Sequence, residues 1–153
     1  MIRAMRPAHL LSIFALASAL GACSAKESQP TLYRPAVGAL GPYSGSVTSG
    51  GLVFVSGKIG TPGGSFTQEV QTALDAVERE LARSGAALSD VISVTVYLTN
   101  LDLYDEFNEI YANRFDPPYP ARACVEVSRL PGGARVELQV IAQAGFRVVP
   151  LND

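Results

Sequence analysis

Strict alternation of apolar and polar residues marks several stretches of the chain, and this two-residue period is typical of strands with one covered face. Residues 91–99 are the clearest case, with an apolar face of Val94, Val96 and Leu98. Residues 47–48 and 52–56 flank Gly50-Gly51, a dipeptide that favours a hairpin turn. A final strand is expected from Ala134 to about Val148.

Two further segments change to the 3.6-residue period of an amphipathic helix. The first begins at a capping residue, either Ser65 or Thr67, and ends before Gly85. Its apolar positions are Val70, Ala73, Leu74, Val77 and Leu81, and polar residues elsewhere on it include Glu69, Glu78, Glu80 and Arg83. The second is expected to run from an Asp102 cap to about Arg114, with an apolar stripe of Leu103, Phe107, Ile110 and Tyr111.

Residues 120–131 (PARACVEVSRLP) are predicted to form a strand with a proline at each end. Alternation along it gives an apolar face of Ala123, Val125 and Val127, and puts Arg122 beside Cys124 on the other face. A guanidinium can hold a carboxylate through two parallel hydrogen bonds, so Arg122 is a candidate binding residue. The alternative is a solvated arginine on an exposed sheet face.

The predicted order is β-β-α-β-α-β-β, which indicates an α+β fold with both helices on one face of the sheet. The other sheet face holds tyrosine, threonine, serine and isoleucine side chains. That mixture is too apolar for a fully solvated face and too polar for a core. Self-association is the expected way of covering it.

Residues 1–22 have the pattern of an export signal, because Arg3 and Arg6 precede an apolar run at residues 10–20. The following Leu20-Gly21-Ala22-Cys23 resembles the bacterial lipobox, which predicts lipidation of Cys23. The alternatives are an ordinary signal peptide cut near Ala22 or Ala25, or an uncut membrane-anchored N-terminus. In each case the domain is exported, and the lipoprotein interpretation anchors it in a bacterial membrane, facing the periplasm.

The chain is accordingly divided into a signal peptide (1–22), a lipidated tether (23–40), one domain (41–148) and a C-terminal tail (149–153). Removal of the signal leaves ten basic against fourteen acidic residues, so a nucleic-acid partner is not expected. His9 is the one histidine and lies in the signal, which excludes histidine-based nucleophiles and histidine metal sites from the mature domain. No metal or cofactor is expected.

The motifs of this domain resemble the Rid/YjgF family of reactive-intermediate deaminases from about Pro35 to Phe146. The residues that carry the resemblance are Gly41-Pro42-Tyr43-Ser44, Val55-Ser56-Gly57-Lys58-Ile59, Val94-Thr95-Val96-Tyr97-Leu98, Phe107-Asn108-Glu109-Ile110-Tyr111, Pro120-Ala121-Arg122-Ala123-Cys124-Val125-Glu126-Val127 and Val136-Glu137-Leu138. The resemblance implies a chorismate-mutase-like fold and a homotrimer whose open sheet faces form a central β-barrel. It also implies hydrolysis of 2-imino or 2-enamino acids to 2-keto acids and ammonia, without a cofactor, in clefts between subunits.

Carried over by position, the resemblance makes Arg122 the partner of the substrate carboxylate and gives Cys124 backbone contacts to the same group. It makes Glu137 the residue that orients the attacking water, and Tyr43 the residue that closes over the substrate. Ser56 and Asn108 are expected to line the pocket. Without the resemblance, Glu137 would read as an exposed carboxylate paired with a neighbouring arginine.

Three features depart from the family pattern: Lys58 stands where glutamine is common, Gly45 where a longer polar residue is usual, and the loop at residues 61–66 is short. The substrate side chain is therefore not given by the resemblance. A different class of function is a non-catalytic lipoprotein that holds a small carboxylate in the same clefts. A third possibility is a chaperone-like or ribonuclease activity. The acidic net charge argues against the ribonuclease, because RNA binding needs a basic surface.

Overall fold

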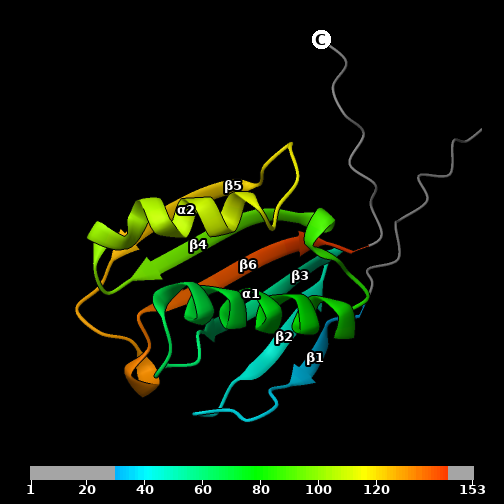
Figure 1. Ribbon diagram of the computed structural model, residues 1–153. Helices are drawn as coiled ribbons and strands as arrows, with labels where there is room; N and C mark the ends of the chain where they lie inside the picture. Colours follow the sequence, from blue (N-terminus) through cyan, green and yellow to red (C-terminus); the bar gives the residue numbers. More distant parts are fainter. Residues whose placement is uncertain (1–29, 145–153) are drawn as a thin grey trace, which may run out of the picture.

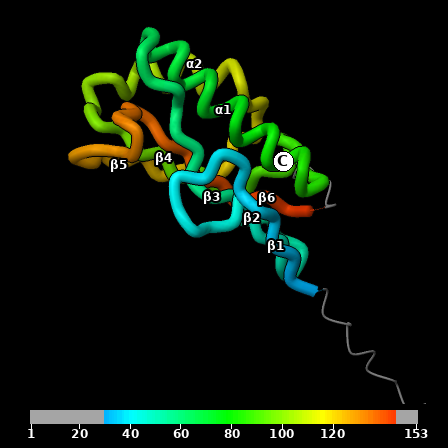
Figure 2. The backbone as a smooth tube through the Cα atoms, turned by 90° about the horizontal axis from the view of Figure 1, so that it is seen from below, coloured from blue at the N-terminus to red at the C-terminus, as the bar shows by residue number. Residues whose placement is uncertain are grey.

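A computed structural model of the protein describes residues 30–144, which form one mixed sheet with two helices. The strands follow the spatial order β1-β2-β3-β6-β4-β5, and all neighbours pair antiparallel except β4 and β5. Both helices lie on the same side of the sheet (Figures 1 and 2). The elements are β1 (Leu32–Pro35), β2 (Ser44–Ser49), β3 (Leu52–Ile59), α1 (Phe66–Arg83), β4 (Val91–Leu98), α2 (Tyr104–Ala112), β5 (Ala121–Glu126) and β6 (Val136–Gln143).

The start of α1 is fixed by a capping box, and Ser65 rather than Thr67 is its N-cap. The Ser65 side chain accepts a hydrogen bond from the backbone N–H of Gln68, whose side chain accepts one from the N–H of Ser65. This reciprocal pair satisfies two donors that a helix start otherwise leaves without partners. At the other end Gly85 takes a positive φ of 75°, as expected for a residue that ends a helix.

The second helix differs from expectation at its start. Residues Leu101–Leu103 form a 3₁₀ turn whose N-cap is Asn100, not Asp102, because the Asn100 side chain accepts from the backbone N–H of Asp102 at 2.8 Å. The α-helix then begins at Tyr104 and ends at Ala112, two residues before the predicted end. The predicted apolar stripe is present, with Phe107 and Tyr111 buried against the core.

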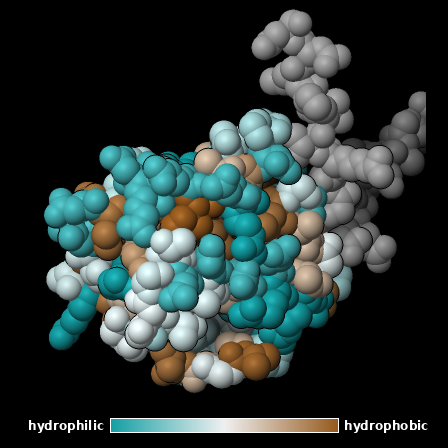
Figure 3. Space-filling model, in the orientation of Figure 1, coloured by the Kyte–Doolittle hydropathy of each residue, from teal (hydrophilic) through white to brown (hydrophobic). Residues whose placement is uncertain are grey.

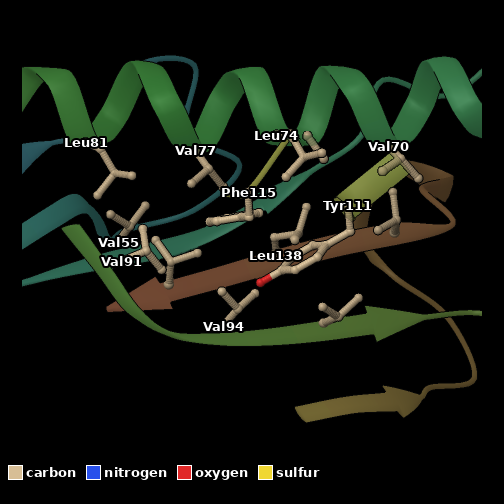
Figure 4. Close-up of a cluster of buried hydrophobic side chains, with 14 of the residues drawn as sticks. Val55, Val70, Leu74, Val77, Leu81, Val91, Val94, Tyr111, Phe115 and Leu138 are labelled. Carbon is tan, nitrogen blue, oxygen red and sulfur yellow. The ribbon is translucent and has the colours of Figure 1, made fainter. Parts of the chain in front are cut away.

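One core fills the space between the helices and the sheet (Figure 4). The apolar face of α1 supplies Val70, Ala73, Leu74, Val77 and Leu81, none of them accessible to solvent, and these pack on the inward residues of β3, β4 and β6. Burying a side chain of this size contributes about 1.5–3 kcal/mol relative to exposure. Amphipathic patterning of α1 and of the central strands is therefore sufficient to define this layer.

Two carboxylates placed on the polar side of α1 by the sequence pattern are instead buried. Glu69 is fully buried, and its carboxylate accepts from the backbone N–H of Arg135 at 2.5 Å and from Arg135 Nε at 2.6 Å. Glu80 is 5 % exposed and faces β2 and β3. Both are paired with basic side chains, which is the condition under which a buried charge is tolerated.

The two ends of the domain also differ from expectation. Strand β1 pairs with β2 in the segment predicted to be tether, so ordered structure begins before residue 41. The final strand begins at Val136 and ends at Gln143, so the predicted strand residues 134, 135 and 144 lie outside it. Residues 145–148 of its predicted range, the predicted tail and the signal peptide lie outside the described residues. The Gly50-Gly51 turn is confirmed, with φ of 58° and 81° at its two glycines.

Viewed from the helix side, the surface is largely hydrophilic over α1 and α2, with an apolar patch between them (Figure 3). The opposite face of the sheet has no covering helix within residues 30–144, and it exposes Phe54 at 42 % and Val125 at 41 %. Alternation along the paired strands adds Val47, Ile141 and Tyr97 to this open face. Its composition therefore matches the semi-polar face expected from the sequence.

Candidate active site

Arg122 lies on the edge strand β5 and points towards α2, where polar and aromatic groups fix its guanidinium. Its Nη2 donates to Asn108 Oδ1 at 2.7 Å and to the Tyr104 hydroxyl at 3.3 Å. The guanidinium carbon also lies 4.6 Å from the ring centroid of Tyr111 and 5.7 Å from that of Phe107. A cation held over aromatic rings and by one amide is oriented before any ligand arrives, which is the requirement for a carboxylate-binding arginine.

A cavity of about 400 Å³ opens beside this guanidinium and is lined by Leu101, Tyr104, Arg122 and Cys124. Cys124 is half-buried and packs against the core, and burial raises the pKa of its thiol despite the opposing charge of Arg122. A thiol whose pKa is raised is a poor nucleophile. The cavity therefore offers one cation, a phenol and two apolar walls to a small anionic ligand.

Arg122 and Cys124 lie on the same face of β5, as predicted. The burial of the two faces differs from the usual pattern, because the face with the polar residues is covered and the apolar face is exposed. Arg122 pairs with Val94 and Cys124 with Val96, so both lie on the side covered by α2. Val125 pairs with Tyr97 on the open side and is exposed. Because the aromatic rings of α2 accept a cation, the apolar face of β5 is the one left uncovered.

Glu137 lies on β6, paired with Tyr97 of β4 on one side and with Ile59 of β3 on the other. Its neighbours Val136 and Leu138 are fully buried beneath the helices, so its own side chain is on the open face. The carboxylate lies against Gly57, in the space that a Cβ at position 57 would occupy. Burial raises the pKa of the Glu137 carboxyl above its ordinary value, which favours its protonated form.

Ser56 and Tyr43 lie at the β2–β3 end of the sheet. Ser56 Oγ donates to the carbonyl oxygen of Ser44 at 2.7 Å, which ties β3 to the start of β2. Tyr43 is 45 % exposed, and its hydroxyl accepts a long hydrogen bond of 3.5 Å from the backbone N–H of Leu40. Neither side chain contacts Arg122 within the described part of the chain.

One copy of the chain therefore brings together only part of the predicted site. Arg122, Cys124 and Asn108 meet under α2, and we call these residues with Tyr104 the arginine half-site. Glu137 lies on the opposite face of the sheet, and together with Gly57 forms what we call the glutamate half-site. The sheet lies between the arginine half-site and the glutamate half-site. A ligand of a few atoms therefore cannot contact both half-sites of one copy.

Sequence reasoning missed three residues that shape these half-sites. Leu101 precedes the predicted helix, and Tyr104 falls within it but outside its predicted stripe, so neither was a candidate. A helix that begins at Tyr104 nevertheless places its first and fifth residues, Tyr104 and Asn108, on one face. Gly57 lies within the motif at residues 55–59, and no role was predicted for it alone. Its signal is a glycine inside an otherwise strand-forming run, which indicates close approach of another group.

Comparison with known proteins identifies the family of this chain. The family model described as endoribonuclease L-PSP matches residues 33–144. The chain belongs to this family. Proteins with similar sequences include the RutC family protein y4sK of Sinorhizobium fredii, 37 % identical over 120 residues that cover 74 % of this chain and 95 % of the relative. A human protein named 2-iminobutanoate/2-iminopropanoate deaminase is 33 % identical, with 72 % and 85 % covered.

Solved structures agree with the L-PSP assignment. The crystal structure of RidA from an Antarctic Psychrobacter species is 32 % identical and matches with a TM-score of 0.67, covering 72 % of this chain and 94 % of that one. The α+β fold predicted from the order of strands and helices is thereby confirmed, and the family contains imine deaminases. Among the described residues of this L-PSP member, no helix is long and apolar enough to cross a membrane.

Proposed function

We propose that this protein hydrolyses 2-imino and 2-enamino acids, such as 2-iminopropanoate or 2-aminoacrylate, to 2-keto acids and ammonia. The observation that carries the proposal is the guanidinium of Arg122, held by Asn108 and the α2 rings at the wall of a small cavity. A fixed fork of this kind recognises a carboxylate next to the reacting carbon. The name of the human relative, an iminobutanoate and iminopropanoate deaminase, supports the reaction class.

The chemistry needs few groups because an imine carbon is already electrophilic. Water adds across the C=N bond, its oxygen to the carbon and one proton to the nitrogen. The second proton of the water then moves from the new hydroxyl to the nitrogen, the carbon–nitrogen bond breaks, and ammonia leaves, so that no oxidant or cofactor is consumed. Arg122 would fix the carboxylate and so hold the imine carbon in place. Glu137 would orient the water and carry its proton, a role that suits a carboxyl group whose pKa is raised towards neutrality.

The two half-sites meet only if copies associate, so the proposed active unit is an oligomer. The resemblance implies a homotrimer in which open sheet faces form a central barrel, and the uncovered apolar residues of that face support such packing. In this arrangement the arginine half-site of one copy faces the glutamate half-site of the next. Tyr43 and Ser56 would complete the cleft from the side of the glutamate half-site.

The proposal is tested with the full chain, purified in mild detergent. 2-Iminopropanoate and a bulkier imino acid are generated in the cuvette by an amino-acid oxidase, and the loss of imine is compared with the uncatalysed rate. Acceleration that disappears in Arg122→Ala and in Glu137→Gln supports the hydrolase. If the folded oligomer gives no acceleration but binds 2-oxobutanoate through Arg122, the second candidate, a carboxylate-binding protein, is correct instead.

We further propose that the domain is exported and anchored by a lipid on Cys23. The support is the basic and apolar pattern of residues 1–22 and the small residues before the cysteine. Expression in a Gram-negative host and fractionation of membranes test this. The wild-type chain should sediment with membranes and gain the mass of the lipid, whereas Cys23→Ala should do neither.

A further inference from the structure

The carboxylate of Glu80 is buried and binds three side chains at once, and it has no part in the proposed reaction. It is 5 % exposed and accepts three hydrogen bonds: from Ser46 Oγ at 2.8 Å, Arg83 Nη1 at 2.8 Å and Lys58 Nζ at 3.4 Å. Burial by itself raises the pKa of Glu80, but the Ser46 hydrogen bond and the charges of Lys58 and Arg83 outweigh it and leave the pKa below its ordinary value. Glu80 is thus held in its charged form.

The basic partners of Glu80 also bind the main chain at both ends of one loop. Arg83 Nη2 donates to the carbonyl oxygen of Pro35 at 3.1 Å, at the end of β1. Lys58 Nζ lies 3.5 Å from the carbonyl oxygen of Gly45, near the start of β2. Residues 36–43 connect these two points and carry Tyr43 at their end. We call this segment the Tyr43 loop.

The main chain is shaped to receive this carboxylate. A Cβ at position 45 would lie 2.8 Å from both Glu80 carboxylate oxygens, so only glycine leaves the space that the charge occupies. Ser46, fully buried, bonds to Glu80 and lies 2.9 Å from Ser84 Oγ, which adds a second contact between β2 and the end of α1. Gly45 and Lys58, two of the departures from the family pattern, therefore belong to one cluster around Glu80.

Apart from these contacts at its ends, the Tyr43 loop makes few contacts with the rest of the domain. Val37 is 83 % exposed and Leu40 68 %, so the loop buries few apolar groups within the copy. Hydrophobic surface at the lower edge of the molecule, over this loop, is visible in Figure 3. A loop with such contacts is mobile unless its ends are fixed, because ordering its main chain costs about 1–2 kcal/mol per residue in entropy.

We propose that Glu80 is a positioning residue that fixes both ends of the Tyr43 loop and so presents Tyr43 to the substrate cleft. The inference rests on the proposed function, since it concerns how that site is assembled. Glu80 does not touch substrate. It acts through Arg83 on the Pro35 end of the loop, and through Lys58 and Ser46 on the Gly45 end.

The test compares wild type, Glu80→Gln and the matched control Glu78→Gln in the full chain. Glu78 lies on the same helix, but its carboxylate pairs with Arg114 at 2.7 Å, away from the loop. Hydrogen exchange followed by mass spectrometry should show amides 36–45 exchanging about tenfold faster in Glu80→Gln and unchanged in Glu78→Gln. Arg83→Gln is the milder variant, which releases only the Pro35 end and should speed exchange mainly at residues 36–39.

Kinetics separate positioning from general loosening of the fold. Glu80→Gln is expected to lower kcat/KM about tenfold, mainly through KM, and to cause no further loss in a Tyr43→Ala background, because both changes remove the same contact. Unchanged exchange at residues 36–45 would overturn the proposal. So would a kcat/KM loss that adds in full to that of Tyr43→Ala.

The design also separates this inference from the proposed function. Exchange needs no turnover, and the affinity for 2-oxobutanoate, measured by calorimetry, can replace kcat/KM in the same double-mutant cycle. A wild-type protein that binds 2-oxobutanoate but does not hydrolyse imines refutes the hydrolase, while the cycle still decides the role of Glu80. A wild-type protein that neither binds nor hydrolyses refutes both the site and the positioning role.

Discussion

The carboxylate of Glu137 lies against the main chain of Gly57, in the space that any side chain at position 57 would fill. Gly57→Ala should therefore push the carboxylate out of place. We expect a loss of kcat/KM about as large as that of Glu137→Gln, with stability changed by no more than about 1–2 kcal/mol, because the displaced group is the flexible end of a side chain on an open face. Steady-state kinetics and thermal melts measure the two effects.

The double variant is the control for this mechanism. If alanine at position 57 acts by moving the carboxylate, it adds little to Glu137→Gln. Losses that multiply would instead mean that Gly57 serves the reaction by a separate route, such as close approach of the substrate to its main chain.

Separation of the two half-sites predicts complementation between inactive variants. Arg122→Ala removes only the arginine half-site and Glu137→Gln only the glutamate half-site. In a mixture unfolded and refolded together in equal amounts, each cleft draws its two halves at random from the two variants. About one quarter of the clefts should then be intact, and about one quarter of wild-type activity should return.

The matched experiment refolds each variant alone and mixes them afterwards. Activity should stay near zero if subunits do not exchange. Failure of the co-refolded mixture to exceed the separate variants would mean that both groups act within one copy, contrary to their places on opposite faces of the sheet.

The two hydrogen bonds to Arg122 should differ in importance. Asn108 accepts from Nη2 at 2.7 Å, and hydrogen bonds to charged groups contribute about 1.5–3 kcal/mol. Asn108→Ala should lower kcat/KM by about ten- to a hundredfold. The Tyr104 hydroxyl lies at 3.3 Å, so Tyr104→Phe, which keeps the ring, should cost only a few-fold. The reverse order would identify the phenol as the main support of the guanidinium.

The raised pKa of Glu137 also predicts a pH dependence of stability. The folded-state pKa of this carboxyl lies above the unfolded-state pKa of about 4.3. Below the unfolded-state pKa the group therefore does not reduce the free energy of unfolding, and it destabilises the fold as pH rises through the folded-state pKa. Glu137→Gln should therefore raise the melting temperature at pH 8, and the gain should shrink towards zero near pH 4. A gain independent of pH would assign the effect to packing, not to the charge.

Glu80 should behave in the opposite way. Its folded-state pKa is lowered, so its contribution to stability is present above the unfolded pKa and is lost as pH falls through the folded one. The protection of amides 36–45, meaning their exchange rate relative to the intrinsic rate at the same pH, should thus fall at acidic pH in wild type, and this fall should be absent in Glu80→Gln. Amides of the α1 core provide the internal reference in the same experiment.

Much of the fold could be predicted because the central elements follow simple periods. The alternation of residues 91–99 and the apolar stripe of α1 gave the correct inward faces, and Gly50-Gly51 gave the hairpin. Strand β1 could not be found in this way, because it is four residues long, lies at an edge and has no buried face. Its position depends on pairing with β2, which is a tertiary contact.

The site was harder to predict for a related reason. Periodicity tells which residues share a face, but not which face a neighbouring helix covers. Arg122 and Glu137 were both recognised as candidates. Their separation across the sheet follows from the register of the strands, because Arg122 lies opposite Val94, which faces the helices, and Glu137 lies opposite Tyr97, which faces away from them. Glu80 was predicted only to lie off the apolar stripe of the helix, because two of its three partners, Ser46 and Lys58, come from β2 and β3, more than twenty residues away in the chain.

The separation of the two half-sites makes a single folded copy resemble a zymogen. Such a copy has every proposed catalytic group but no complete cleft. Under the proposed function it becomes active when it associates with other copies, whereas a zymogen becomes active on proteolysis. Under the proposed function, specific activity should then fall on dilution below the dissociation constant of the oligomer. If Cys23 carries the proposed lipid, confinement to a membrane surface would raise the local concentration of copies and so keep the oligomer assembled.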